Sequence, residues 1–242
     1  MTMPIRKSTF ERAVIDIAED VRKRPSTKCW QQWDESQLWY ELVACLLGSR
    51  VSFELAQASA RSLDSSGVLD HAFSTRGSQG YSDMVFSVLS KPVWVKTYYG
   101  SQRHIRYRFP KSRAEGIAKT AEQIYCSPER SIRNILEQSS DSRNARKNIV
   151  EKSHGIGAKQ ASLFLRNIGY SDDVAILDSH ILRYMHIVGI MGGTLTSVSG
   201  IGTYGRLESD LCKYADDLGF PLSCIDTAIW IVMRVYQKEF AK

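Results

Sequence analysis

Two residues of this 242-residue chain have the types and spacing for covalent chemistry: Lys159 and, 19 residues later, Asp178. Lys159 is expected in the first turn of a helix, where the positive end of the helix dipole is unfavourable for a positive charge. A lysine must be neutral to act as a nucleophile, so this placement favours attack by its amine. The alternative is a lysine that only touches a phosphate.

Asp178 follows the apolar run Val174-Ala175-Ile176-Leu177, which we expect to be buried. A carboxylate carried by a buried segment is held rigidly and partly desolvated, so it can stabilise a developing positive charge and transfer protons. Asp178 can also be the N-cap of a helix that begins at Ser179 or His180, and the two roles are compatible.

The sequence around Lys159 predicts two helices, residues 143–152 and 158–168, joined by a tight turn. Glycine tolerates positive φ, so both glycines of the turn can adopt it and let the backbone approach a partner. With the free N–H groups of the second helix they would cradle a phosphate without reading sequence, although an ordinary turn has the same pattern. The candidate contacts to a nucleic-acid backbone are Gly155, Ile156, Gly157, Arg146 and Lys147.

A second feature is a basic and aromatic stretch from Lys91 to Arg113, which holds seven Lys or Arg residues and no acidic residue. Positive side chains neutralise phosphates, and aromatic faces stack on bases or wedge between them. The alternative is a solvated loop whose aromatic residues belong to the core. Which of Trp94, Tyr98 and Tyr107 would act as a wedge stays open.

The composition fits a helical protein with a polyanionic partner. The net charge is +6, which suits nucleic acid without requiring it. Apolar residues recur at helical spacing, as in Phe10, Val14, Ile17 and Val21, and only the stretch 93–109 has strand character. We therefore predict an all-α fold with room for one short β-hairpin.

The five cysteines are scattered, with no pair at the spacing of a zinc site or a redox motif. We predict no metal site and a reducing, cytoplasmic location near the nucleoid. The N-terminal residues lack the apolar run of a secretory signal, and no stretch approaches 18 uncharged apolar residues, so no membrane span is expected.

The stretch from His154 to Tyr170, HGIGAKQASLFLRNIGY, followed by VAILDSHILR, resembles the helix-hairpin-helix (HhH-GPD) DNA glycosylase superfamily. Within it, the chain is most similar to the archaeal-type 8-oxoguanine DNA glycosylase/AP lyases. The resemblance is fullest over residues 142–185. It extends to LWYEL at residues 38–42 and to RYRF at residues 106–109 with the AEGI that follows.

The resemblance implies a two-lobed helical fold with a DNA cleft between the lobes, in one glycosylase unit of residues 1–242. Lobe one would span about 38–167, and lobe two about 1–37 with 168–242. By likeness, Lys159 falls on the Schiff-base lysine and Asp178 on the catalytic aspartate. Ser179 departs from the archaeal pattern, which carries a basic residue there.

The C-terminal helix offers candidates for recognition of the damaged base. Asp226 and Trp230 are four residues apart and so share a helix face. The resemblance places base recognition here, where a carboxylate could accept hydrogen bonds from a guanine-type base and an aromatic ring could stack on it. Trp230 is equally well explained as core. Lys242, at the end of the chain, is a third candidate by resemblance.

The implied function is a bifunctional DNA glycosylase/AP lyase of base excision repair, acting as a monomer on double-stranded DNA that contains a damaged base. The expected lesion is 8-oxoguanine. We expect no cofactor. Some relatives bind an iron–sulfur cluster through four C-terminal cysteines, whereas only Cys212 and Cys224 lie in this region. One alternative is the same fold acting on another damaged or modified base. The other is a DNA-binding helix-hairpin-helix protein without catalysis.

Overall fold

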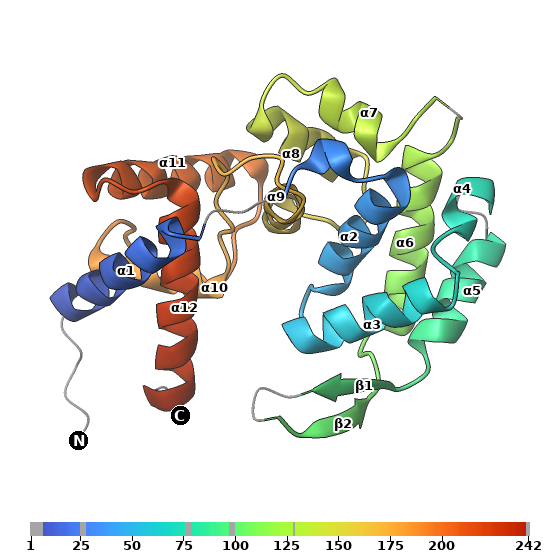
Figure 1. Ribbon diagram of the computed structural model, residues 1–242, viewed down its shortest axis with the longest axis horizontal. Coiled ribbons are helices and arrows are strands. Elements are labelled where there is room, and N and C mark those ends of the chain that lie inside the picture. The colour runs from blue at the N-terminus through green and yellow to red at the C-terminus, as the bar shows by residue number, and fades with distance from the viewer. Residues whose placement is uncertain (1–6, 25–27, 76–78, 97–99, 128, 241–242) are drawn as a thin grey trace. The chain divides into compact units, whose positions relative to one another are not determined.

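The computed structural model describes residues 7–24, 28–75, 79–96, 100–127 and 129–240 (Figure 1). These residues form α-helices and one two-stranded sheet, so the prediction of a helical fold with a short hairpin is confirmed. The chain divides into two compact units, which we name by their place in the sequence. The central unit is Cys29–Ile168, and the terminal unit combines Met1–Lys28 with Gly169–Lys242.

The central unit is built around one buried helix, α2. Helices α3, α6, α7 and α9 pack against it, and its side chains from Leu38 to Leu47 are almost all buried. A helix that is apolar on every side belongs in a core. The elements of this unit are η1 (Trp30–Gln32), α2 (Glu35–Leu47), α3 (Phe53–Ser65), α4 (His71–Thr75), α5 (Gln79–Leu89), β1 (Val93–Lys96), β2 (Gln102–Ile105), α6 (Pro110–Ile124), α7 (Ile132–Glu137), α8 (Ser142–Glu151) and α9 (Ala158–Asn167).

The start of α2 fixes the position of α7. The Glu35 carboxylate accepts hydrogen bonds from the backbone N–H groups of Ile132 (2.7 Å) and Arg133 (3.2 Å), so it caps the first turn of α7. The Arg133 guanidinium donates in return to the carbonyl of Trp33. These contacts hold residues 29–37 in the central unit, whereas the lobe boundary expected from sequence lies at residue 38.

The hairpin of β1 and β2 extends from this unit (Figure 1). Val95 is buried where β1 packs on α3. Its neighbour Trp94 points to the opposite face, as alternation along a strand requires, and pairs with His104 across the sheet at 4.0 Å between ring centroids. The outer face of the hairpin is therefore aromatic and solvent-exposed.

The terminal unit combines α1 (Lys7–Arg22) with α10 (Ser179–Val188), α11 (Ile201–Asp217) and α12 (Leu222–Phe240). Helix α1 crosses α12, and α10 packs on both (Figure 1). Phe10 meets the ring of Tyr236 edge to face at 5.0 Å between centroids. The first and last helices of the chain thus share one core.

Among the described helices, none is by itself long and apolar enough to cross a bilayer. Helices α11 and α12 meet the length and composition limits only as a pair, and that pair is bent by 97°.

Gly169, which follows α9, cannot be replaced without strain. Its φ is +73°, and a Cβ there would lie 2.2 Å from the backbone oxygen of Lys28. Gly219, after α11, has a similar φ of +75°, but a Cβ there would meet open space. An alanine at Gly219 would pay only for the left-handed backbone conformation, whereas an alanine at Gly169 would also clash with the Lys28 backbone.

We expect Gly219→Ala to lower the free energy of unfolding by about 1–2 kcal/mol, the cost of a left-handed conformation for alanine. Gly169→Ala should cost clearly more, because the Lys28 backbone must also move. Denaturant unfolding of both variants measures the difference. Equal losses would show that the close approach to Lys28 contributes nothing.

Candidate active site

The predicted helix-hairpin-helix is present as α8, a turn at residues 152–157 and α9 (Figure 1). Asp141 is the N-cap of helix α8, and its carboxylate accepts from the N–H of Asn144 at 2.8 Å. This hydrogen bond holds the pKa of Asp141 below its ordinary value. Gly155 has φ +83°, as expected. Gly157 has φ −100° and is the N-cap of α9, so of the two glycines only Gly155 uses the positive φ that glycine permits.

The turn is fixed against α6 by close packing. The Thr120 hydroxyl accepts from the N–H of His154 at 2.9 Å and donates to the carbonyl of Gly116 at 2.7 Å. A Cβ on Gly116 would lie only 3.2 Å from the carbonyl oxygen of His154. Ile156 is buried and anchors the centre of the turn in the core, whereas Gly155 and Gly157 on either side of it are exposed.

Lys159 is the second residue of α9 and is half-buried. Its place in the first turn is the predicted one. The N-cap, Gly157, has no side chain to accept from the first N–H groups of the helix, so these donors are available to an anion. The Arg113 guanidinium lies beside the turn: Nη2 donates to the carbonyl of Ser49 at 3.3 Å, and Nη1 is 3.6 Å from the position of a Cβ on Gly155.

The two candidate phosphate contacts on α8, Lys147 and Arg146, differ in exposure. Lys147 is exposed and forms a weak pair with Glu151 at 3.8 Å. Arg146 is 3% exposed, and its Nη1 donates to the Ser162 hydroxyl of α9 at 3.3 Å. The buried guanidinium joins the two helices of the hairpin. We therefore correct the prediction for Arg146, which packs inside the motif instead of facing a phosphate.

Asp178 lies in the terminal unit as the N-cap of α10. Its Oδ1 accepts from the N–H groups of His180 (2.8 Å) and Ile181 (3.0 Å). Oδ2 accepts no hydrogen bond from the residues that the structure describes. The capping role foreseen from sequence is thus present, and one carboxylate oxygen is left for chemistry.

The segment before Asp178 belongs to neither a helix nor a sheet. Three side chains bind its consecutive N–H groups. Ala175 donates to Glu208 Oε1 at 2.9 Å, Ile176 to Asp226 Oδ2 at 3.1 Å and Leu177 to the Tyr204 hydroxyl at 3.0 Å. Tyr204 and Glu208 are not among the residues predicted from sequence. Their spacing of four residues puts them on one face of α11, but the sequence gives no sign of partners about 30 residues away.

Asp226 contacts Ile176, two residues before Asp178, and Trp230 contacts His180, two residues after it. The Asp226 carboxylate is 3% exposed and holds the Ile176 N–H, which gives it a structural role. The half-exposed Trp230 ring meets His180 edge to face at 6.4 Å, and the Arg234 guanidinium lies 4.7 Å over it. Recognition of a base by Asp226 and Trp230 stays a prediction.

Other candidates fall elsewhere. Tyr107 is 4% exposed and donates to the carbonyl of Leu47 at 2.6 Å, and burial raises its pKa. It is therefore a core residue and no wedge. Trp94 is 63% exposed and remains available. Tyr98 and Lys242 lie outside the described residues.

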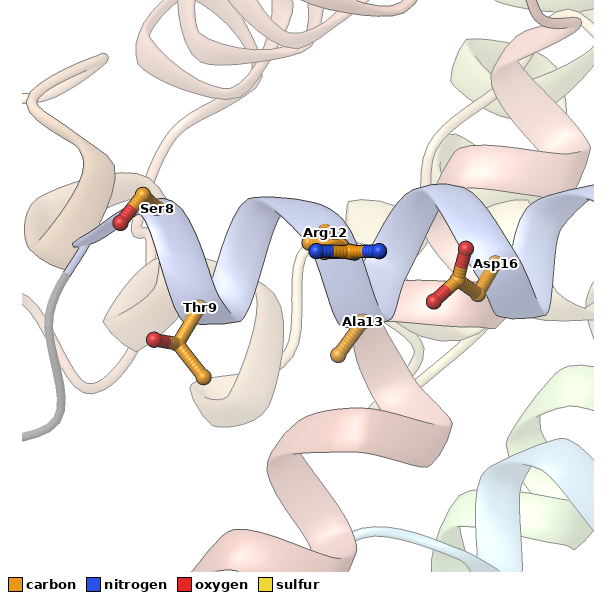
Figure 2. A pocket seen from close by; sticks show the side chains of 5 residues that line it. All are labelled: Ser8, Thr9, Arg12, Ala13 and Asp16. Carbon is orange, nitrogen blue, oxygen red and sulfur yellow. The ribbon is translucent and has the colours of Figure 1, made fainter.

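Two further features bear on ligands. Among the described residues, no three His, Cys, Asp or Glu side chains gather as metal ligands. A surface hollow of about 460 Å³ is lined by Ser8, Thr9, Arg12, Ala13 and Asp16, all on α1 (Figure 2). Because these side chains come from a single helix, they do not converge on a reacting group as a catalytic site requires.

Comparison with known proteins agrees with this geometry. Residues 97–220 match the family described as 8-oxoguanine DNA glycosylase. A protein of Saccharolobus solfataricus named 8-oxoguanine DNA glycosylase/AP lyase is 32% identical over 142 residues, which are 56% of this chain and 67% of that one. A Korarchaeum cryptofilum protein of the same name is 29% identical over 82% of this chain and 80% of its own length.

A solved structure shares the fold. The 8-oxoguanine glycosylase/lyase of Methanocaldococcus jannaschii, in complex with a 15mer DNA containing 8-oxoguanine, aligns with a TM-score of 0.62 at 22% identity, over 98% of this chain and 91% of that one. The matched family region contains the hairpin, Lys159 and Asp178 in the order the resemblance requires. This chain belongs to the 8-oxoguanine DNA glycosylase family.

Proposed function

We propose that this protein is a bifunctional DNA glycosylase/AP lyase that removes 8-oxoguanine from duplex DNA. The observation that carries the proposal is the family match across residues 97–220, which includes both Lys159 and Asp178. The relatives with that name support the substrate. The five cysteines carry free thiols, which suits a reducing cytoplasm, and a monomer bound to the nucleoid is the simplest arrangement.

In the proposed reaction, the neutral amine of Lys159 attacks C1′ of the damaged nucleotide, and the base leaves with the electrons of the glycosidic bond. The Asp178 carboxylate stabilises the positive charge that develops on the sugar and accepts a proton from the lysine. Opening of the sugar ring gives an imine between Lys159 and C1′. Loss of a C2′ proton then expels the 3′ phosphate by β-elimination, and water releases the lysine.

The hairpin supplies binding energy for DNA. Backbone N–H groups at the start of α9 and the exposed cation of Lys147 can bind phosphates, while Trp230, beside His180, offers a face for the extruded base. We propose that no metal or cofactor takes part, because amine chemistry needs none.

The first prediction concerns the covalent intermediate. Borohydride added during reaction with a duplex carrying 8-oxoguanine opposite cytosine should reduce the imine and trap the protein on DNA. Lys159→Gln should abolish the adduct, because the proposed reaction forms the imine through this amine alone. The exposed Lys213 of α11 gives a control outside the hairpin, since Lys213→Gln should trap like the wild type. If the wild type binds DNA but forms no adduct with any of a panel of damaged bases, the proposal fails.

A second prediction isolates the charge of Asp178. Asp178→Asn keeps an oxygen that can accept from the His180 and Ile181 N–H groups, so the cap of α10 survives. Base excision under single-turnover conditions should fall by about 10²–10⁴-fold, while DNA affinity is held or improved. Asp173→Asn, on the exposed loop nearby, should change neither. A large loss of affinity in Asp178→Asn would mark the carboxylate as structural.

A third prediction separates Lys147 from Arg146. Lys147→Gln should weaken DNA binding and reduce the slope of log affinity against log salt by about 1, without changing stability. Arg146→Gln should lower the free energy of unfolding by about 1–3 kcal/mol, because it breaks a buried contact between α8 and α9. The reverse pattern, measured by salt titration and denaturant unfolding, would restore Arg146 as the phosphate contact.

A further inference from the structure

The backbone that ends on Asp178 is held by side chains and not by secondary structure. The N–H groups of Ala175, Ile176 and Leu177 are the last ones before the Asp178 residue, and each is bound by a different side chain of α11 or α12. Val174, Ala175 and Leu177 are buried, so these N–H groups have little access to water. Buried backbone donors without partners are costly, and this segment has no neighbouring strand or helical turn to supply them.

Tyr204 has the most specific part in this arrangement. Its hydroxyl donates to the carbonyl of Ala175 at 2.7 Å and accepts from the N–H of Leu177 at 3.0 Å. One atom therefore bridges two backbone groups two residues apart and restrains the dihedral angles between them. The Tyr204 side chain is 1% exposed, so the bridge has no competition from water.

We propose that Tyr204 is a positioning residue for base excision, supported by Glu208: they hold Ala175–Leu177 in the one conformation that aims the Asp178 carboxylate at the reacting sugar. This inference rests on the proposed function of Asp178. Catalytic groups act over short distances, and a misplacement of about 1 Å can cost about 10²-fold in rate. A residue that sets the backbone one position before the carboxylate thus controls rate without touching DNA.

A purely structural role would give a different result, and the same helix offers a matched control. The Tyr214 hydroxyl is 2.7 Å from the Tyr184 hydroxyl, away from the 175–177 segment. Tyr204→Phe and Tyr214→Phe each remove one hydrogen-bonded hydroxyl from α11. Loss of either should lower the midpoint of thermal unfolding, so general destabilisation affects both variants.

The experiment measures single-turnover base excision on duplex DNA with 8-oxoguanine opposite cytosine, together with DNA affinity. Tyr204→Phe should lower the rate at least about tenfold with unchanged affinity, whereas Tyr214→Phe should keep the wild-type rate. In the Asp178→Asn background, Tyr204→Phe should cause no further loss, because it acts through the carboxylate that is already gone. A full additional loss in that background would overturn the inference.

Glu208 provides a second test that does not depend on the folding of Tyr204→Phe. Glu208→Gln keeps an oxygen that can accept from Ala175 N–H and should retain most of the rate, while Glu208→Ala should lose it. Wild-type rates in both Tyr204→Phe and Glu208→Ala would overturn this inference but not the proposed function. An inactive wild-type protein would overturn the proposed function and this inference with it.

Discussion

The need to satisfy the buried N–H groups of residues 175–177 is the constraint on which the terminal unit depends. Val174, Ala175 and Leu177 bury their side chains in the core, but their backbone belongs to no helix or sheet that could satisfy its N–H groups before Asp178 caps α10. Polar side chains from α11 and α12 supply the missing acceptors. Helices α11 and α12 therefore pack where their side chains can accept from the N–H groups of residues 175–177. Glu208 and Asp226 are buried because they satisfy these N–H groups.

The hairpin of the central unit is subject to a related constraint on its backbone N–H groups. The turn must expose backbone N–H groups at the start of α9 and still be rigid. Ile156 fixes it to the core, Thr120 binds the N–H of His154, and Gly116 permits the close approach of that residue. Arg146 then ties α8 to α9 from inside. Lys159 is thus carried by a helix that is anchored through the preceding turn to α6 and through Ser162 to α8.

Much of this arrangement could be predicted from sequence, because it depends on local signals. The glycines and the helical periodicity predicted the helix-hairpin-helix and the helix boundaries near it. The position of a carboxylate after a buried run predicted the cap at Asp178. The errors arose where a long-range contact decides the outcome. Arg146 was expected on a phosphate, but Ser162 accepts its hydrogen bond inside the motif. Tyr107, one of three aromatic residues left open as a wedge, reaches the carbonyl of Leu47, a contact that its local sequence does not indicate. Tyr204 and Glu208 could not be found at all, because they bind backbone N–H groups about 30 residues away, and such groups carry no side-chain signature.

The central claim is that Lys159 forms a covalent bond to the damaged nucleotide. Mass spectrometry of the digested borohydride-trapped complex tests it most directly, because it locates the sugar remnant on one side chain. We predict the added mass on Lys159, and a remnant on Lys152 or on any other amine would contradict the claim.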